Sequence, residues 1–567
     1  MSLDAALPGD ITGASDLIDL VRSSVIGEDE AVAGPFGIRR ITYADYTASG
    51  RSLSFIEDFI REAVLPLYAN THTESSGTGL QTTGFREDAR DIIRSCVGAG
   101  DDHAVIFCGS GATGAIDRLV AVLNLRLPRD LDERYSFSSQ IPVEEKPVVF
   151  IGPYEHHSNE LPWRESIADV VRIREDEDGH IDLHHLRTEL ELYRERPVKI
   201  GSFSAASNVT GIISNTHAIA RLLHEYDALS FWDFAASSPY VAIDMEGEHD
   251  GISYKDAIFF SPHKLIGGPG TPGVLVARRE LFSNTVPAVV GGGTVSYVST
   301  EDHHYLDDIE HREEGGTPAI VESIRAGLVF LLKERVGPDS IRELEDDFIR
   351  RAINRWLEHP NIEVLGNPRA DRLSIVSFII KFRDRSLHHN YVVAVLNDVF
   401  GIQARGGCSC AGPYGHTLLG IDAETSHRFE DEVMHGCEGI KPGWVRVNFN
   451  YFISETVFDF VVSAVEMVAD RGWTLLPFYN FDPHSGLWRH HDGMATPPLS
   501  LHDITFDGGR LSYPDRRHTA PEEDLARYLD EAQQIFDAAE ADHPVGAHID
   551  LGPGFEALRW FPIPEEL

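Results

Sequence analysis

The chain of 567 residues is too long for one compact core, so roughly two to four domains are expected. Apolar residues make up 42% of the sequence and charged residues 25%, an ordinary composition for a folded protein that argues against disorder. The 90 acidic residues exceed the 49 basic residues, and the net charge of −41 would repel nucleic acid and anionic lipid, so no partner of either kind is expected.

The start of the chain and its cysteines indicate a cytoplasmic protein. Residues 1–17 (MSLDAALPGDITGASDL) lack the basic start and apolar run of a signal peptide, and no later window holds about 18 uncharged apolar residues. The five cysteines are few and odd in number, which favours reduced thiols over a disulfide framework. A cysteine with a special role is then expected to be chemical rather than structural.

Residues 1–40 are predicted to form a helical lead-in, and residues 41–330 a large α/β domain. In the second range short apolar runs alternate with helical periodicity. Buried runs of this length between helices are typical of a largely parallel sheet. The predicted strands cover residues 104–108, 147–151, 199–203, 229–233, 257–260 and 273–277.

Residues 331–474 show a different pattern and are predicted to form a smaller α+β domain. A long charged helix at about 338–358 leads to the apolar run SIVSFIIKF at 374–382. A helix over 389–399 and the strand WVRVNFNYF at 444–452 follow, before a further helix.

Residues 475–567 are rich in Pro, Gly, His and Asp and show weak periodicity before a helical stretch over 521–542. We interpret them as a C-terminal appendage, whose role the sequence does not disclose.

A lysine stands at the end of one predicted strand. The segment Phe259–Gly273 (FFSPHKLIGGPGTPG) runs from apolar residues through Ser-Pro-His-Lys into a glycine-rich stretch. Lys264 is therefore expected to reach over the carboxyl end of the sheet, where ligands of α/β proteins bind. A lone lysine at a strand end is more often a surface residue, so this interpretation depends on the neighbouring segments.

Two further segments follow predicted strands. Gly109–Ala115 (GSGATGA) opens a helical pattern, so its N–H groups and the helix dipole suit a phosphate, although such turns are also common without a ligand. The histidines of Glu155–Asn159 (EHHSN) suit either a metal or a satisfied polar role. Because no cysteine or carboxylate lies at zinc spacing, no metal site is predicted.

A carboxylate also ends a predicted strand. Asp233 closes the run LSFWD upstream of Lys264. A buried carboxylate is costly without a partner, and a protonated pyridine nitrogen is a suitable one. Together the segments predict one site, with a phosphate cradle, a ring-stacking histidine, a pyridinium partner and a lysine.

These segments, in this order, resemble the class V aminotransferase family, in particular its group II cysteine desulfurase and selenocysteine lyase branch. The resemblance runs from about Tyr43 to Met467. It implies PLP fold type I, with pyridoxal 5′-phosphate bound to Lys264 as a Schiff base. It also implies that His156 stacks on the pyridoxal ring, and that further cofactor contacts come from Ala112, Thr113, Asn208, Asp233, Ser261 and His263.

The motif GGGTVSYVS followed by EEGGTP resembles the family's segment that reaches the phosphate of the neighbouring subunit, through Thr317. The resemblance thus implies a homodimer with shared sites.

The segment Arg405–Pro413 (RGGCSCAGP) resembles the family's catalytic-cysteine segment, which implies that Cys410 is the nucleophile. Arg446 matches the arginine that holds the substrate α-carboxylate, a task suited to a guanidinium, and Arg405 is a second candidate for substrate binding. Glycines and Arg405 around the thiols favour an exposed, electropositive turn, and the alternative is two buried small side chains. Cys408 adds a second thiol, and a relay between the two stays open.

Three features depart from the family pattern. Ala236 replaces a glutamine expected to contact the ring hydroxyl, so that hydrogen bond is missing or supplied elsewhere. The segment between Pro413 and Arg446 is longer than in typical desulfurases, and the appendage at 475–567 has no counterpart in the common ones. These differences weaken the assignment of a substrate more than that of fold or cofactor.

The resemblance implies a cysteine desulfurase or selenocysteine lyase that removes sulfur from an amino acid through a persulfide on Cys410, with a sulfur-acceptor protein as a further partner. The alternative within the family is a carbon-sulfur lyase, epimerase or transaminase without a covalent cysteine. A catalytically silent scaffold is a third reading, against which the intact lysine, aspartate and phosphate turn argue.

Overall fold

The computed structural model describes residues 14–71, 73–493, 497–515, 517–542 and 546–567, which fold into two compact units. Of these residues, unit 1 contains those up to Ile26 together with Tyr46–Asp346 and Arg369–Leu373. Unit 2 contains Gly27–Asp45, Asp347–Pro368 and Ser374–Leu567. Each unit therefore combines segments that are distant in the sequence.

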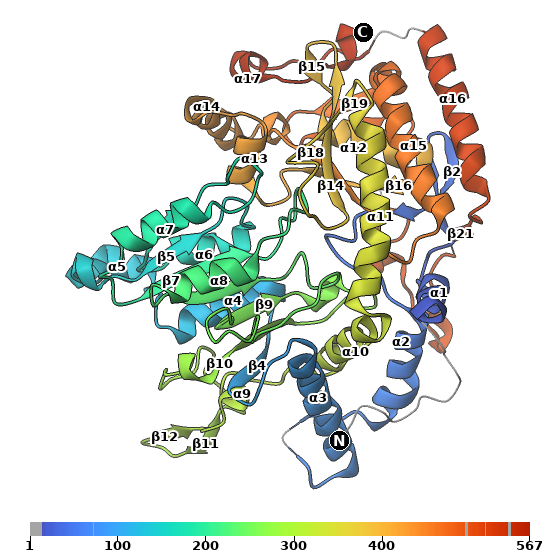
Figure 1. Ribbon diagram of the computed structural model, residues 1–567. Coiled ribbons are helices and arrows are strands. Elements are labelled where there is room, and N and C mark those ends of the chain that lie inside the picture. The colour runs from blue at the N-terminus through green and yellow to red at the C-terminus, as the bar shows by residue number, and fades with distance from the viewer. Residues whose placement is uncertain (1–13, 72, 494–496, 516, 543–545) are drawn as a thin grey trace. The chain divides into compact units, whose positions relative to one another are not determined.

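A seven-stranded sheet forms the centre of unit 1, in the order β4-β10-β9-β8-β7-β5-β6 (Figure 1). Strand β10 runs antiparallel to both of its neighbours, and the pairs from β9 through β6 are parallel. The strands are β4 (His103–Cys108), β5 (Val148–Ile151), β6 (Asp169–Arg172), β7 (Lys199–Ser204), β8 (Leu229–Asp233), β9 (Ala257–Phe260) and β10 (Gly273–Arg278).

Burial explains why these runs form central strands. Every residue of β4, β5, β7 and β9 is buried, as expected for a sheet covered on both faces. The apolar side of helix α4 (Gly111–Val122) packs on one face through residues such as Ile116 and Leu119. Other helices of unit 1 are α1 (Ala14–Ser24), α3 (Gly77–Cys96), α7 (Leu183–Leu192), α8 (Thr216–His224) and α10 (Ile320–Val336).

The prediction of an α/β domain with a largely parallel sheet is confirmed, and each predicted strand is present within one residue at either end. Strand β6 is not predicted from the sequence, because all its residues are partly exposed and it has no buried apolar run. The predicted helical lead-in is right for α1 but wrong for residues 30–40, which form the antiparallel strands β1 (Glu30–Gly34) and β2 (Gly37–Arg40). Residues 1–13 of that prediction lie outside the described part of the chain.

Unit 2 is an α+β structure around a second sheet, in the order β13-β14-β18-β17 with β15 beside β14. Its predicted charged helix is α11 (Pro338–Leu357), whose first residues belong to unit 1. The short strands β3 (Thr42–Tyr43) and β16 (Ile402–Gln403) pair in parallel. Further elements are β13 (Ile362–Val364), β14 (Ile375–Phe382), β15 (Arg385–Ser386), α12 (His389–Phe400), β17 (Arg405–Gly407), β18 (Trp444–Asn448) and α15 (Glu455–Arg471).

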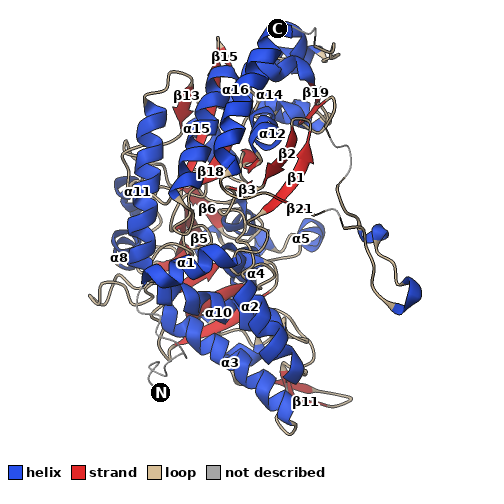
Figure 2. Ribbon diagram, turned by 90° about the vertical axis from the view of Figure 1, so that its right-hand side faces the viewer, coloured by secondary structure: helices blue, strands red, loops and turns tan. Residues whose placement is uncertain are grey.

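Residues 475–567 share the hydrophobic core of unit 2. Helix α16 (Asp524–Asp542) contributes Tyr528 and Phe536 to the same buried cluster as α12 and α15. Strand β21 (His518–Thr519) pairs with β1, which lies between β21 and β2 (Figure 2). The Tyr528 hydroxyl accepts the Arg40 N–H at 3.2 Å. No helix among the described residues is long and apolar enough to span a bilayer.

Candidate active site

The turn after β4 lies against the segment that follows β9. The Ala112 N–H donates to Ser261 Oγ at 2.7 Å, at the first turn of α4. Gly111 has a φ of +56°, and a Cβ there would lie 2.8 Å from Ser261 Oγ, so a side chain fits poorly. Because β4 and β9 are both antiparallel to β10, this turn and Ser261 meet at the carboxyl ends of their strands.

The segment Ser261–Lys264 is held in place by residues 49–50. The Gly50 N–H donates to the His263 carbonyl at 2.8 Å, and Ser49 Oγ lies 3.2 Å from His263 Nδ1. Burial, reinforced by the positive charge of Lys264, lowers the pKa of His263 to about 4. His263 is therefore neutral at neutral pH and offers a hydrogen bond rather than a charge.

Asp233 is a buried carboxylate at the end of β8, with 5% of its surface exposed. It accepts the Ala235 N–H at 2.8 Å. Burial raises the pKa of Asp233, and the backbone hydrogen bond and the charge of Lys264 oppose that shift. The aspartate and the lysine thus interact electrostatically at neighbouring strand ends.

Glu155 anchors the turn that carries His156. Its carboxylate accepts hydrogen bonds from the N–H groups of Gly152 and Ser204, the Ser204 hydroxyl and the Asn159 amide, at 2.6–3.1 Å. Burial raises the pKa of Glu155 to about 7 against these bonds, and the charge of Asp233 adds to the increase. The turn after β5 is thereby fixed to the end of β7.

His156 is connected to the turn after β4. The Ser158 N–H donates to His156 Nδ1 at 3.1 Å, and Ser158 Oγ lies 3.0 Å from the same nitrogen. Ser158 Oγ also lies 2.7 Å from Thr113 Oγ1. The candidate stacking histidine and the candidate phosphate threonine are therefore joined through one serine.

In unit 2, two arginines stand opposite each other on adjacent strands. Arg405 of β17 lies directly opposite Arg446 of β18. Two positive charges in these positions repel each other and destabilise the pairing of the strands. The Asp45 carboxylate bridges them, accepting from Arg446 Nη2 at 2.8 Å and from Arg405 Nε at 2.9 Å. The Arg446 side chain is 4% exposed and that of Arg405 46% exposed, so the bridge connects a buried cation with one at the surface.

The cysteine segment forms a tight turn in the same unit. The Ala411 N–H donates to the Cys408 carbonyl at 3.0 Å, and Ser409 and Cys410 both have left-handed backbones, with φ of +52° and +57°. Two central residues with positive φ define a type I′ turn. Cys410 is exposed and Cys408 half-buried, which agrees with the predicted exposed turn and not with two buried thiols.

Comparison with known proteins identifies the fold and the family. The sequence model of the class-V aminotransferases matches residues 42–429, more than half of the chain. The chain belongs to the class-V aminotransferase family. Members of this family are enzymes that depend on pyridoxal phosphate, and the architecture of unit 1 is that of PLP fold type I.

Similar sequences and structures bear the name cysteine desulfurase. Probable cysteine desulfurases of Staphylococcus epidermidis and Staphylococcus aureus are each 28% identical over 383 residues, 66% of this chain and 84% of theirs. The cysteine desulfurase of Thermococcus onnurineus NA1 superposes with a TM-score of 0.61 at 23% identity, covering 76% of this chain and 95% of that one. Escherichia coli CsdA gives 0.57 at 21% identity, covering 76% and 94%.

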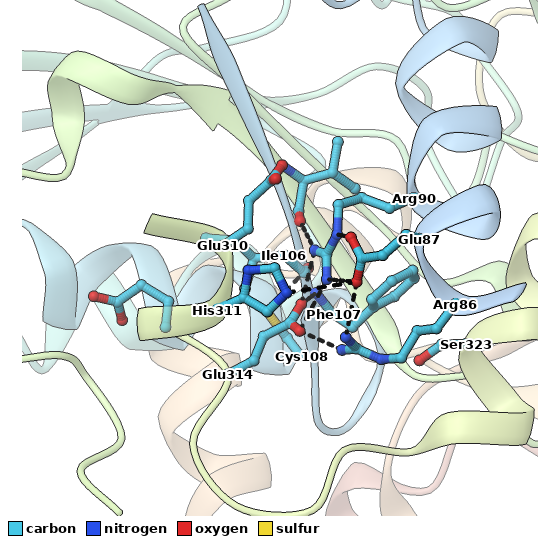
Figure 3. A network of polar contacts seen from close by, with 12 residues as sticks. Arg86, Glu87, Arg90, Ile106, Phe107, Cys108, Glu310, His311, Glu314 and Ser323 are labelled. Carbon is cyan, nitrogen blue, oxygen red and sulfur yellow. Dashed lines mark hydrogen bonds and ion pairs between the residues drawn. The ribbon is translucent and has the colours of Figure 1, made fainter. Parts of the chain in front are cut away.

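Thr317 of this class-V aminotransferase is exposed and follows a firmly anchored segment. Glu314 accepts the Phe107 N–H of β4 at 2.7 Å and pairs with Arg86 and Arg90 of α3, which converge on it in Figure 3. Positive charge on both arginines keeps the pKa of the Glu314 carboxyl low despite burial. The next residues, Gly315 and Gly316, then lead to Thr317.

The predicted cofactor residues all lie in unit 1, and most of them are linked there. Ala112 contacts Ser261 directly, whereas Thr113 is connected to His156 through Ser158. Asn208 is buried in the turn after β7. Ala236 is buried three residues beyond Asp233, and its methyl side chain has no hydrogen-bonding group.

Sequence reasoning missed several residues of these arrangements. Glu155 and Ser158 belong to the segment EHHSN, whose position directly after a predicted strand already indicated a site. Asp45 had no local signal, because its partners lie about four hundred residues further along the chain.

Proposed function

We propose that this class-V aminotransferase is a cysteine desulfurase-like enzyme that binds pyridoxal 5′-phosphate through Lys264 and transfers sulfur from an amino acid to Cys410. The observation that carries the sulfur chemistry is the exposed Cys410, in a turn three residues beyond the end of the strand that bears Arg405. The names of the sequence relatives support the same reaction.

The residues of unit 1 fit the cofactor. The hydroxyls of Thr113 and Ser261, near the N-terminus of α4, together with a neutral His263, suit a phosphate. Asp233 is a buried carboxylate of the kind that pairs with a protonated pyridine nitrogen, and His156 supplies a flat ring. When bound, pyridoxal phosphate supplies an electron sink for the α-carbon of the substrate.

The side chains of the protein then have separate tasks. The Arg446 guanidinium holds the α-carboxylate of the amino acid. Lys264 Nζ takes the proton from the α-carbon and later returns one. The Cys410 thiolate attacks the substrate sulfur, so that a sulfur–sulfur bond forms as the carbon–sulfur bond breaks. With cysteine as substrate, the products are alanine and a Cys410 persulfide.

The test is a single-turnover reaction of the purified protein with cysteine, in the absence of an added thiol. One alanine and one protein-bound persulfide per bound cofactor are expected, measured by amino-acid analysis and by mass spectrometry of the peptide containing Cys410. Alanine production with no persulfide on any cysteine would falsify the covalent mechanism. The remaining family reactions, carbon-sulfur lyase, epimerase or transaminase, would then apply.

The exposed position of Thr317 supports a homodimer in which this residue completes the phosphate site of the second copy. Apolar side chains gather on the preceding segment, where Val286, Val290, Tyr297 and Val298 are each at least half exposed. A second copy is a suitable cover for such a surface. Light scattering should give twice the mass of the chain, and a monomer with stoichiometric cofactor contradicts this part of the proposal.

The transferred sulfur requires an acceptor, and we infer a sulfur-acceptor protein that reaches the exposed Cys410. All five cysteines are free thiols, in agreement with a reducing, cytoplasmic location.

A further inference from the structure

Ser158 lies between two residues expected at the cofactor and has no role in the proposed chemistry. It follows β5 by seven residues, in a 3-10 turn at His157–Asn159. Its Oγ is 2.7 Å from Thr113 Oγ1 and 3.0 Å from His156 Nδ1. A single hydroxyl thus connects the turn after β5 with the first turn of α4.

The backbone of Ser158 determines which nitrogen of His156 carries the proton. The Ser158 N–H donates to Nδ1, and a ring nitrogen that accepts an N–H bond carries no hydrogen of its own. A neutral His156 therefore has its proton on Nε2. The Ser158 hydroxyl has one proton and two neighbours that can accept it. Nδ1 already accepts the Ser158 N–H, and Thr113 Oγ1 is the nearer of the two, at 2.7 Å against 3.0 Å, so we assign the proton to the bond with Thr113.

A bound phosphate decides the direction of the hydrogen bond between the two hydroxyls. Phosphate oxygens of a dianion only accept, so a Thr113 hydroxyl that binds one of them must donate its proton to it. Thr113 Oγ1 is then an acceptor towards Ser158, and both donors point towards the anion. Hydrogen bonds arranged in such a chain strengthen one another.

We propose that Ser158 is a positioning residue for the cofactor phosphate: it donates to Thr113 and thereby strengthens and orients the bond from Thr113 to the phosphate. This inference rests on the proposed binding of pyridoxal phosphate in unit 1. It separates two functions of one residue, since the Ser158 N–H orients His156 and the Ser158 hydroxyl acts on Thr113.

The test compares two ligands that differ only in the phosphate. Apoprotein of the wild type and of Ser158→Ala is titrated with pyridoxal phosphate and with pyridoxal, and each Kd is measured from the absorption change. Ser158→Ala keeps the backbone N–H, so its affinity for pyridoxal is expected to be unchanged. Its affinity for pyridoxal phosphate is expected to fall about three- to tenfold, the effect of one hydrogen bond.

Four further variants sharpen this comparison. Ser158→Thr retains a hydroxyl and should restore the affinity for pyridoxal phosphate, whereas Ser139→Ala, at an exposed serine elsewhere in unit 1, serves as the neutral control. Thr113→Val should weaken binding of pyridoxal phosphate, and adding Ser158→Ala to it should weaken binding no further, because Ser158 acts through Thr113.

Two results overturn the inference while leaving the proposed function intact. One is an unchanged affinity of Ser158→Ala for pyridoxal phosphate, and the other is an equal loss for both ligands, which assigns the effect to His156 or to the fold. Failure of the wild type itself to bind pyridoxal phosphate is a different result, which overturns the cofactor assignment and this inference with it.

Discussion

The phosphate turn of unit 1 (Gly109–Ala112) and the cysteine turn of unit 2 (Cys408–Ala411) solve the same backbone problem in different ways. Each follows a strand, leads into a helix and contains a left-handed residue; the first turn overlaps the start of α4. In the phosphate turn the positive φ falls on Gly111, which adopts it without steric cost. In the cysteine turn it falls on Ser409 and Cys410, at about 1–2 kcal/mol for each residue.

This difference in backbone strain fits the separate tasks proposed for the two turns. The turn at Gly109–Ala112 is unstrained and joined to Ser261 by a hydrogen bond, a fixed arrangement that would suit the proposed binding of the cofactor phosphate. The cysteine turn lies above its lowest backbone energy and is exposed, so a change of conformation costs it little. The proposed sulfur transfer, in which the thiol meets both a substrate and a sulfur acceptor, would use this freedom.

The largest effect is expected from Lys264→Ala in unit 1. Wild-type protein should be yellow, and borohydride should fix the cofactor onto the peptide that contains Lys264. In Lys264→Ala the fixed adduct should be absent altogether, by mass spectrometry after digestion. Lys441→Ala, which removes a half-exposed lysine of unit 2, is the control that should react like wild type. An adduct that persists at residues 259–273 of Lys264→Ala contradicts the assignment.

Cys410→Ala should separate the tasks of the two turns. It is expected to abolish persulfide formation and turnover with cysteine while leaving the cofactor absorption unchanged, because the residues proposed to bind the cofactor belong to unit 1. Cys408→Ala should be milder, and Cys437→Ala is the matched control for a thiol of the same unit. If Cys408→Ala, Cys410→Ala and the double variant all keep full activity on the best substrate, both thiols are structural.

Asp45→Asn tests whether the arginine pair in unit 2 is a carboxylate site. The substitution removes the negative charge that faces the buried Arg446 Nη2 at 2.8 Å and loosens the orientation of this guanidinium. We expect KM for cysteine to rise about tenfold with a smaller change in kcat, as for the loss of an interaction made equally in ground and transition states. Steady-state kinetics measure the split. A fall in kcat alone, at constant KM, assigns Asp45 to another step.

Gly111→Ala should damage the phosphate turn selectively. The new methyl group would lie 2.8 Å from Ser261 Oγ in a left-handed backbone, so a loss of about 1–2 kcal/mol in stability is expected. The affinity for pyridoxal phosphate should fall with it, because the Ala112 N–H to Ser261 bond is displaced. Chemical denaturation and cofactor titration measure the two effects, and unchanged values in both show that the turn tolerates a side chain.

Ser409→Gly should have the smallest effect and the opposite sign. Relief of one left-handed residue is partly offset by the greater freedom of glycine in the unfolded chain, leaving a gain of roughly 0–1 kcal/mol. The rate of Cys410 alkylation by iodoacetamide reports the turn itself and should change while that of Cys437 does not. Destabilisation by more than 1 kcal/mol argues that the turn is not strained at Ser409.

The sequence predicted the parts of the fold whose signal is local. Runs such as residues 104–108 and 257–260 are continuous, apolar and buried, so they read as central strands. Two of the four residues of the edge strand β6 are charged and all four are partly exposed, so β6 has no apolar run. The hairpin of β1 and β2 is completed by residues near 519, far along the chain, and it also has no strong local pattern. The same limit applies to Asp45, whose arginine partners become neighbours only in the folded unit.

The candidate site residues that could be predicted are likewise those with a local sequence signal. Lys264, Asp233 and the turn at Gly109–Ala115 were found because each ends or follows a recognisable strand. The link from Ser158 to Thr113 could not be predicted, because it depends on side-chain directions in two loops.

The pairing of β1 with β21 has a consequence for how the protein is made. Glu30 pairs with Thr519 and Arg40 with Tyr528, and translation at about 5–20 residues per second separates the synthesis of such partners by tens of seconds. During that interval β1 offers an unpaired edge on the ribosome, a surface that favours association with other chains. Folding of unit 2 is therefore completed only after translation has passed residue 528.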